Sequence, residues 1–252
     1  MKQVTAQVIS NTEPMPDVHL LWLQAPEIAG VAQPGQFVMV RCGDSHDLLL
    51  RRPFSIHRVA NGGQIALLFN IVGRGTEWLA RCKKGDPLDL LGPLGRGFSL
   101  QPASRRFLLI AGGIGIAPLV FLAEKGLNQG GSIRLLIGAP NAASLYPRSL
   151  LPPSIDPVTA TEDGSEGRKG MITELISDFV NQADQVFACG PASMYKSMAA
   201  QGCLTGRPVQ ISLEVRMGCG LGACYSCTIK TKKGLQQVCR DGPVFELDDI
   251  LW

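Results

Sequence analysis

The spacing of apolar runs changes once along this chain, close to Phe98, and the change predicts two differently built units. Before it, brief apolar or alternating runs are separated by Gly, Pro, Asp and Asn, a pattern typical of short strands joined by turns. We expect six strands here, over residues 4–11, 18–26, 35–43, 51–59, 64–73 and 86–95. Strands at this spacing predict a small antiparallel β-barrel.

Beyond Phe98 the chain alternates between apolar strands, glycine-rich turns and helices. Strands are expected within 106–111, 132–140, 157–164 and 185–191, and helices within 112–127, 171–182 and 192–202. This alternation predicts a parallel sheet flanked by helices, with its ligand site at the carboxyl ends of the strands. A cysteine-rich tail begins near Ile211 and is too short to hold its own core. The expected domains are a barrel over 1–100, an α/β unit over 101–210 and a small C-terminal unit over 211–252.

Charge and composition exclude several classes of protein. The net charge of +3 is mild and no basic run is present, which argues against nucleic-acid binding. The N-terminus "MKQVTAQVIS" lacks the apolar core of a signal peptide, so we expect a cytoplasmic protein with reduced thiols. The longest uncharged run, Phe107–Ala123, is shorter than the roughly 20 apolar residues of a membrane span and is broken by glycines and Pro118.

Four of the eight cysteines, Cys219, Cys224, Cys227 and Cys239, lie close together with the spacing C-x4-C-x2-C-x11-C. A C-x4-C-x2-C run with a distant fourth cysteine is the plant-type [2Fe-2S] ligand pattern. Small residues between the first two cysteines would let backbone N–H groups approach the cluster sulfurs. Structural zinc usually takes two short cysteine pairs, and only one is present; disulfide frameworks belong to small secreted chains. Buried thiols could explain one or two of the positions, so the spacing favours a [2Fe-2S] cluster.

A second motif, "LLIAGGIGIAPL", places Gly112, Gly113 and Gly115 between a predicted strand and a predicted helix. A helix start of this kind offers free N–H groups to a phosphate. The motif lacks the last glycine of the standard dinucleotide fingerprint, so a tight turn without a ligand stays open as an alternative. After the next strand there is no acidic residue for a ribose hydroxyl and no nearby arginine for a 2′-phosphate, which weakly favours NADH over NADPH.

A third motif, "LLLRRPFSI", places two arginines beside Pro53 and Ser55. Arginine can hold a pyrophosphate in a forked geometry, and serine can donate a hydrogen bond to a flavin edge. A solvated strand edge ending at Pro53 would explain the same residues, and the residues alone do not decide between the two. Of the cysteines outside the tail, only Cys189 stays open as a site residue, because it ends a predicted parallel strand.

Together these motifs resemble the ferredoxin reductase-type flavoproteins, and within them the electron-transfer subunits of class 1B dihydroorotate dehydrogenases, over nearly the whole chain. "CGLGACYSC" followed by "VCRDGPVF" is the most specific part of the match. The resemblance implies an FAD-binding barrel, an NAD-binding α/β domain and a [2Fe-2S] domain. The implied flavin residues are Arg52, Pro53, Phe54, Ser55, Leu68, Phe69, Asn70, Gly75 and Thr76. The implied NAD residues are Gly112, Gly113, Gly115, Cys189 and Gly190.

Two positions depart from the family pattern: Asn70 stands where a basic residue is expected, and Arg74 where an acidic one is common. These departures put the detailed flavin phosphate contacts in question. They leave the cofactor itself unaffected, because the other residues of both flavin motifs match.

The implied function is electron transfer. Nicotinamide carries two electrons as hydride and a [2Fe-2S] cluster carries one, so a flavin must stand between them. No side-chain constellation for substrate chemistry remains: His19, His46 and His57 are better explained as packed or surface residues than as catalytic bases. The chemistry then belongs to a partner, which the resemblance implies is an FMN-containing dihydroorotate dehydrogenase catalytic subunit of pyrimidine biosynthesis, in a heterotetramer of two plus two subunits. The implied electron flow runs from FMN through the cluster and FAD to NAD+.

Two alternatives remain. The first is the small FAD/[2Fe-2S] subunit of another NAD(P)H-linked complex, such as a bifurcating ferredoxin:NADP reductase or a sulfide dehydrogenase. In those proteins an aspartate is often among the cluster ligands, so four cysteines count against this alternative. The second is a zinc-binding scaffold without redox chemistry, which would require the flavin and nucleotide motifs to be coincidences.

Overall fold

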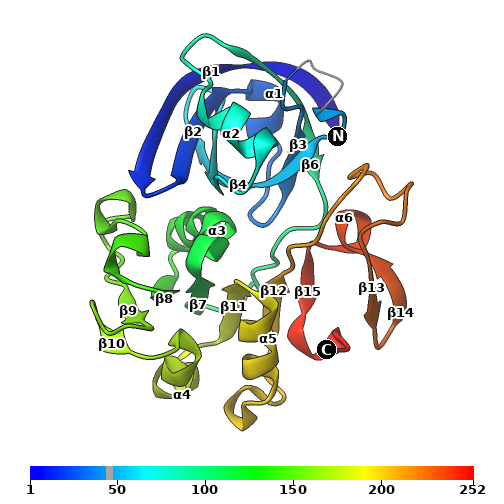
Figure 1. The fold of residues 1–252 in the computed structure, drawn as a ribbon. Helices are drawn as coiled ribbons and strands as arrows, with labels where there is room; N and C mark the ends of the chain where they lie inside the picture. Colours follow the sequence, from blue (N-terminus) through cyan, green and yellow to red (C-terminus); the bar gives the residue numbers. More distant parts are fainter. Residues whose placement is uncertain (44–47) are drawn as a thin grey trace.

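The computed structural model describes residues 1–43 and 48–252, which form a barrel, a sheet flanked by helices, and a small hairpin beside them (Figure 1). His46 lies outside the described residues. The barrel occupies the upper part of Figure 1, the sheet the lower part, and the C-terminal hairpin the right-hand side. Within the described residues, no helix is long and apolar enough to cross a membrane.

The N-terminal part is a closed six-stranded antiparallel barrel with the strand order β1-β2-β5-β4-β3-β6. Its strands are β1 (Lys2–Met15), β2 (Val18–Gln24), β3 (Phe37–Val40), β4 (Arg52–Ala60), β5 (Gln64–Asn70) and β6 (Pro87–Leu94). Two short helices, α1 (Pro26–Ala29) and α2 (Arg74–Ala80), lie in the connections. Each strand coincides with one of the predicted apolar runs, and its inward-facing side chains form the barrel core. The predicted antiparallel barrel is confirmed.

The second part is a seven-stranded sheet with the order β10-β9-β8-β7-β11-β12-β15. Its strands are β7 (Arg106–Gly112), β8 (Ser132–Ala139), β9 (Val158–Thr161), β10 (Arg168–Lys169), β11 (Gln185–Cys189), β12 (Val209–Ser212) and β15 (Val244–Glu246). The helices are α3 (Ile116–Asn128), α4 (Ile176–Phe179) and α5 (Ala192–Ala199). All neighbours are parallel except β12 and β15. The predicted parallel sheet is confirmed, with one antiparallel edge strand that comes from the tail.

The structure differs from the prediction over residues 171–182, where one continuous helix was expected. The segment is a 3₁₀ turn, then α4, then a second 3₁₀ turn. Ile172 explains part of the irregularity: a Cβ on Gly138 would lie 2.7 Å from its Cβ, so this segment packs directly onto the end of β8. The β-branched residues in the segment also lower its helix propensity.

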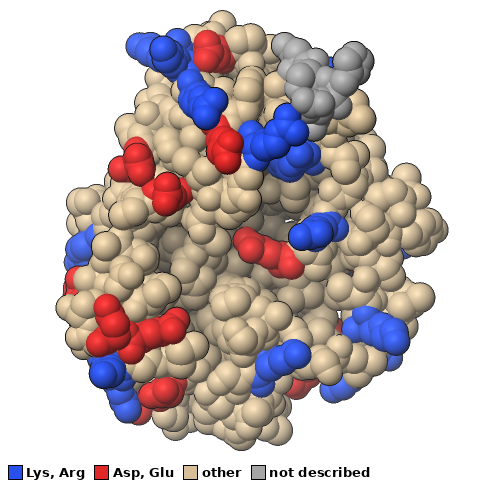
Figure 2. All heavy atoms as spheres, in the orientation of Figure 1, with Lys and Arg blue, Asp and Glu red and all other residues tan. Residues whose placement is uncertain are grey.

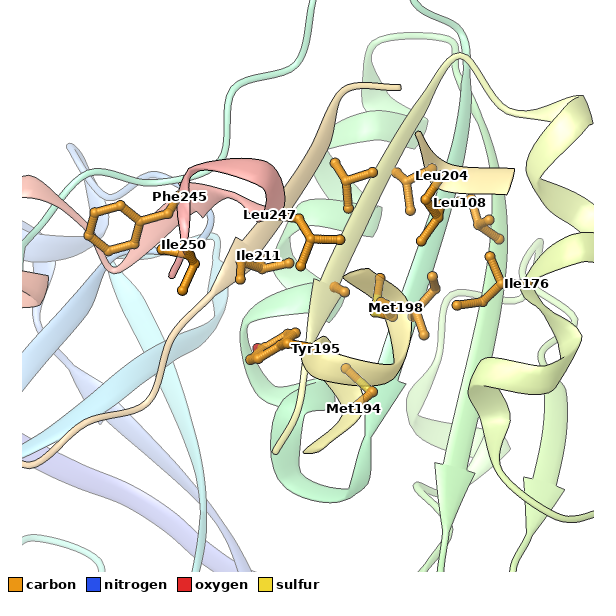
Figure 3. Packing of buried hydrophobic residues seen from close by; sticks show 14 of the residues in the cluster. Leu108, Ile176, Met194, Tyr195, Met198, Leu204, Ile211, Phe245, Leu247 and Ile250 are labelled. Atoms are coloured by element: carbon orange, nitrogen blue, oxygen red, sulfur yellow. The ribbon is translucent and has the colours of Figure 1, made fainter. Parts of the chain in front are cut away.

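The C-terminal part contains the hairpin of β13 (Thr228–Thr231) and β14 (Gly234–Gln237), followed by the short helix α6 (Val238–Asp241). Figure 3 shows side chains after this hairpin, such as Leu247 and Ile250, in one apolar cluster with Tyr195 and Met198 of α5. The tail therefore shares the core of the sheet, in agreement with the expectation that it is too short for a core of its own.

Two sets of buried polar contacts hold the barrel on the sheet. The side chains of Gln185 and Gln210 pair with the backbone of the connecting segment Ser99–Gln101, at distances of 2.8 to 3.1 Å. On the other side, His57 of β4 is fully buried against the start of α3.

His57 is a neutral imidazole in one tautomer. Its Nδ1 lies 2.8 Å from the carbonyl oxygen of Ala117, which can only accept, so Nδ1–H donates. Its Nε2 then accepts from the hydroxyl of Tyr146 at 3.0 Å. Burial lowers the pKa of His57 to about 4, so the ring stays uncharged at neutral pH. It links β4 to the start of α3 and to Tyr146 through neutral hydrogen bonds.

Candidate functional site

A cleft of about 1000 Å³ opens between the barrel and the sheet. Figure 2 shows a hollow near the middle of the molecule with acidic and basic side chains beside it. The walls of the cleft come from β4, from β5 and the loop after it, from the start of α3, and from the segment Ser212–Met217. A cavity of this size suits a cofactor-sized ligand.

All nine barrel residues that the sequence analysis assigned to a flavin line this cleft: Arg52, Pro53, Phe54, Ser55, Leu68, Phe69, Asn70, Gly75 and Thr76. Strands β4 and β5 are antiparallel neighbours, so closure of the barrel brings the two motifs together. The rings of Phe54 and Phe69 lie 5.4 Å apart and give the cleft an apolar floor.

The polar groups of the cleft differ in whether they already have hydrogen-bond partners within the protein. Arg51 is committed to Asp89, with Nη2 2.5 Å from Oδ2 and Nη1 3.0 Å from the backbone oxygen. Arg52 donates to the carbonyl oxygen of Leu50. Within the described residues, the buried Oδ1 of Asn70 has no hydrogen-bond partner.

These groups fit a bound flavin nucleotide. Buried polar atoms are normally hydrogen-bonded, and a ligand hydroxyl or N–H could donate the hydrogen bond that Oδ1 of Asn70 lacks. A Cβ on Gly75 would lie 3.2 Å from Nε of Arg52, so the missing side chain lets the guanidinium rest against the first turn of α2. The hydroxyl of Thr76 accepts from the N–H groups of Val72 and Gly73 at 2.8 and 3.1 Å and therefore shapes this turn.

The sequence analysis missed the far wall of the cleft, the segment Ser212–Met217. A signal was present, because the segment follows β12 at the carboxyl edge of the sheet, where ligands of such sheets bind. Glu214 faces the cleft and is open to water there, while the protein on its other sides desolvates the carboxyl group and raises its pKa. This wall therefore adds an acidic group that no barrel motif supplies.

The residues assigned to NAD come together at the carboxyl ends of β7 and β11, beside the cleft. Gly112, Gly113 and Gly115 form the turn into α3, and Cys189 and Gly190 end the neighbouring strand. A Cβ on Gly115 would lie 2.0 Å from the carbonyl oxygen of Cys189, so only glycine allows this approach. The next residues of the turn and helix, including Ile114 and Ala117, line the cleft, so the two candidate sites adjoin.

The thiol of Cys189 is buried under β12. Its Sγ lies 3.6 Å from the carbonyl oxygen of Ser212, and desolvation raises its pKa far above the usual range. The hydroxyl of Tyr195 accepts from the N–H of Gly190 at 2.9 Å and donates to the same Ser212 oxygen at 2.6 Å. The strand end is thus held by α5 and β12 together.

Cys219, Cys224 and Cys227 lie on the loop of residues 217–227, the cysteine loop, and Cys239 faces this loop. The four thiols lie in two pairs. Cys219 interacts with Cys224, and Cys227 with Cys239. Cys227 and Cys239 are 3% exposed, whereas Cys224 is exposed to solvent. Within the described residues, no three His, Cys, Asp or Glu side chains converge on a point that could hold a single metal ion. Two thiol pairs suit two bridged irons, because each iron takes two protein ligands.

Backbone groups of the loop already point at the sulfur atoms. The N–H groups of Leu221 and Ala223 donate to Sγ of Cys219 at 3.3 and 3.4 Å, and that of Gly222 donates to Sγ of Cys239 at 3.1 Å. In iron–sulfur proteins, backbone N–H groups commonly donate to the cluster sulfurs and stabilise their negative charge.

Side-chain surroundings set the two pairs apart. A hydrogen bond with the hydroxyl of Ser226, at 3.2 Å, lowers the pKa of the Cys224 thiol to about 6. Burial, with the Cys227 thiol nearby, raises the pKa of Cys239 to about 12. Metal binding needs thiolates, so Cys224 is prepared for a cation, while Cys239 depends on the charge of the metal to lose its proton.

The cleft and the cysteine loop are joined directly. Met217 lines the cleft, and Cys219 is two residues further along the chain, so their Cα atoms lie within about 7 Å. Gly220, with φ of +73°, rests on Met39 of the barrel: a Cβ there would lie 2.6 Å from the Met39 side chain. A cluster on this loop would thus sit beside a ligand in the cleft.

Comparison with known proteins agrees with this arrangement. A family model described as the iron–sulfur cluster binding domain of dihydroorotate dehydrogenase B matches residues 214–251. The electron transfer subunit of dihydroorotate dehydrogenase B (NAD(+)) from Desulforamulus reducens is 40% identical over 259 residues, covering 100% of this chain and 99% of that protein. The subunits of the same name from Shouchella clausii and Fusobacterium nucleatum are 36% and 34% identical over at least 98% of their lengths.

Solved structures share the fold. The structure of an NADH-dependent reduced ferredoxin-NADP oxidoreductase, described for flavin-based electron bifurcation, aligns with a TM-score of 0.89 at 26% identity, over 99% of this chain and 90% of that chain. The ferredoxin reductase of carbazole 1,9a-dioxygenase aligns with a TM-score of 0.71 at 19% identity, over 83% and 68% of the two chains. The full-length relatives at 32 to 40% identity decide the family: the chain belongs to the electron transfer subunits of dihydroorotate dehydrogenase B (NAD(+)).

Proposed function

We propose that this chain passes electrons between NAD(H) and a dihydroorotate dehydrogenase catalytic subunit, using FAD and a [2Fe-2S] cluster. Bound together, these groups would let the chain exchange hydride with NAD and single electrons with a partner. The observation that carries the proposal is the segment Ser212–Met217, which lines the cleft and continues without a break into the cysteine loop.

In this proposal the cleft holds FAD. Arg52 binds the pyrophosphate, Ser55 and Asn70 pair with polar groups of the flavin and its side chain, and Gly75 leaves room at the turn into α2. Pro53, Phe54, Leu68, Phe69 and Thr76 shape the walls. The support is that all nine residues line one cleft and that Asn70 Oδ1 lacks a partner within the described residues.

NAD is proposed to bind at the carboxyl ends of β7 and β11. The space that a Cβ on Gly113 would point into is empty within 4 Å, so the pyrophosphate could approach the turn formed with Gly112 and Gly115. Cys189 and Gly190 would flank the nicotinamide. The support is the shared edge of the two sites, through which a nicotinamide can reach a flavin in the cleft.

The cluster is proposed to be held by Cys219, Cys224, Cys227 and Cys239, within a C-terminal unit over 211–252 that follows the FAD unit, 1–100, and the NAD unit, 101–210. The paired thiols and the three backbone donors support it. Since Cys224 is exposed, electrons would leave the molecule on that side.

The partner is proposed to be an FMN-containing catalytic subunit, in a complex of two plus two chains. The cysteine loop supports a protein contact, because residues 217–229 carry no charge and Leu221 and Tyr225 are 46% and 68% exposed.

Spectroscopy and co-purification test the proposal. The purified chain should show flavin bands and a broad cluster absorption, both bleached by NADH under anaerobic conditions. Co-purified with the catalytic subunit, it should support dihydroorotate-dependent reduction of NAD+, and a Cys219→Ser complex should not. A colourless protein, or an intact loaded complex without this activity, would overturn the proposal.

The TM-score of 0.89 favours one other candidate, a subunit of a bifurcating NADH-dependent oxidoreductase. Supplying the protein with NADH, reduced ferredoxin and NADP+ distinguishes the two. Reduction of NADP+ that requires NADH and reduced ferredoxin together would support the second candidate, whereas dihydroorotate-dependent activity alone would support the first proposal.

A further inference from the structure

Gln237 carries a buried amide beside the cysteine loop. Its side chain is 3% exposed, and within the described residues neither Oε1 nor Nε2 has a hydrogen-bond partner. Buried amides are normally paired, so a completely unpaired one indicates that a partner outside the polypeptide belongs there.

The position of the amide relates it to one cluster ligand. Gln237 ends β14, two residues before Cys239. A Cβ on Gly222 would lie 3.1 Å from Oε1 of Gln237, and the N–H of Gly222 donates to Sγ of Cys239 at 3.1 Å. The amide therefore contacts the loop residue that already donates to this sulfur.

The charged side chains nearby, Arg240 and Asp241, make no hydrogen bond with the side-chain amide of Gln237. Asp241 accepts from the backbone N–H of Gln237 at 2.8 Å and from Nε of Arg240 at 3.2 Å. These contacts satisfy the backbone at this position and pair the two charges with one another.

We propose that Gln237 donates a hydrogen bond from Nε2 to a sulfur of the cluster and thereby raises its reduction potential. The inference rests on the proposed function for the presence of the cluster. Thiolate and sulfide sulfurs only accept hydrogen bonds, and a half-turn of the amide exchanges Oε1 and Nε2, so Nε2 can take the place beside Gly222 that Oε1 occupies. Reduction adds negative charge to the cluster, which a donor stabilises more strongly in the reduced form.

A potentiometric titration of the full chain with its cofactors, followed by EPR, tests the role of Gln237. In Gln237→Leu the reduction equilibrium should shift about tenfold toward the oxidised cluster, which is about 59 mV for a one-electron couple. Gln236→Leu is the matched control, since Gln236 is adjacent on β14 and only partly buried. Equal potentials in Gln237→Leu and the wild type would overturn the proposal and identify the partner as water.

A measurement on the wild type covers the case in which Gln237→Leu loses its cluster. With glutamine side chains labelled with ¹⁵N, pulsed EPR of the reduced protein should show a ¹⁵N coupling to the cluster. A normal cluster signal without this coupling would overturn the role of Gln237 alone. If the wild type gives no [2Fe-2S] signal, the proposed function itself fails.

Discussion

The cleft and the cysteine loop are built in opposite ways. Lining residues of the cleft run from Phe37 to Pro243 and meet only because a barrel closes and a sheet packs beneath it. The cysteine site takes all its thiols from the segment between Cys219 and Cys239, and backbone N–H groups of the same segment donate to two of the four sulfurs. A site gathered from the whole chain depends on how the barrel and the sheet are joined, whereas a local site depends on a few neighbouring residues.

The largest expected effect breaks the local site alone. Cys227→Ser removes a buried thiol that is proposed as a cluster ligand and does not line the cleft. Iron and sulfide should fall to background while the flavin content stays near that of the wild type, as measured by iron analysis and flavin absorbance. Cys203→Ser, outside the loop, should keep both. Loss of flavin together with iron would show that the two regions are not independent.

The next effect concerns the contact that joins the barrel to the sheet. His57 has a pKa of about 4 in the folded protein against 6.5 unfolded, so between these values the unfolded chain binds more protons. Stability should therefore fall as the pH drops from 6.5 to 4, and at 1.36 kcal/mol per pH unit the loss is about 3 kcal/mol. Denaturant unfolding of the wild type and His57→Gln across this range checks it. The same pH dependence in both proteins would contradict the assignment.

A smaller effect tests the cleft itself. Arg52→Ala should weaken FAD binding about 10- to 100-fold, because a hydrogen bond to a charged group contributes about 1.5–3 kcal/mol. Iron content should be unchanged. Arg81→Ala provides the control, because Arg81 ends α2 outside the cleft. Titration of the flavin-free protein with FAD measures both affinities, and equal affinities would exclude Arg52 as a flavin ligand.

The smallest effect tests whether surface charge supports the hairpin. Nζ of Lys233 lies 2.5 Å from Oδ2 of Asp249, but the lysine side chain is 65% exposed. Lys233→Ala should cost at most about 1 kcal/mol and less in high salt, because exposed ion pairs are weak and screened. A larger loss of stability, or one that salt does not reduce, would mean that the loop depends on this tail contact.

The same contrast explains what could be predicted from the sequence. The barrel strands were predictable because each is an apolar run bounded by turn residues. The cysteine spacing could be recognised as a [2Fe-2S] pattern because all four cysteines lie in one short segment. Strand β15 was not predictable, because it pairs with β12 across the intervening loop. The wall at Glu214 was missed although its place after β12, at the carboxyl edge of the sheet, gave a signal. The helix expected over 171–182 was wrong as one element: Ile172 packs against the end of β8, and β-branched residues lower the helix propensity of the segment. The unpaired amide of Gln237 has no sequence signal, since its burial depends on the folded loop.

The pairing of Ser212 with Val244 has a thermodynamic consequence for metal loading. These residues flank the whole cysteine segment, and antiparallel neighbours have Cα atoms about 5 Å apart. Folding of the sheet thus closes the segment into a ring before any iron arrives, and the entropy of bringing its ends together, which grows with loop length, is already lost. Incoming iron and sulfide meet tethered ligands at high effective concentration, so chemical reconstitution should succeed on the folded apoprotein and fail on an unfolded one.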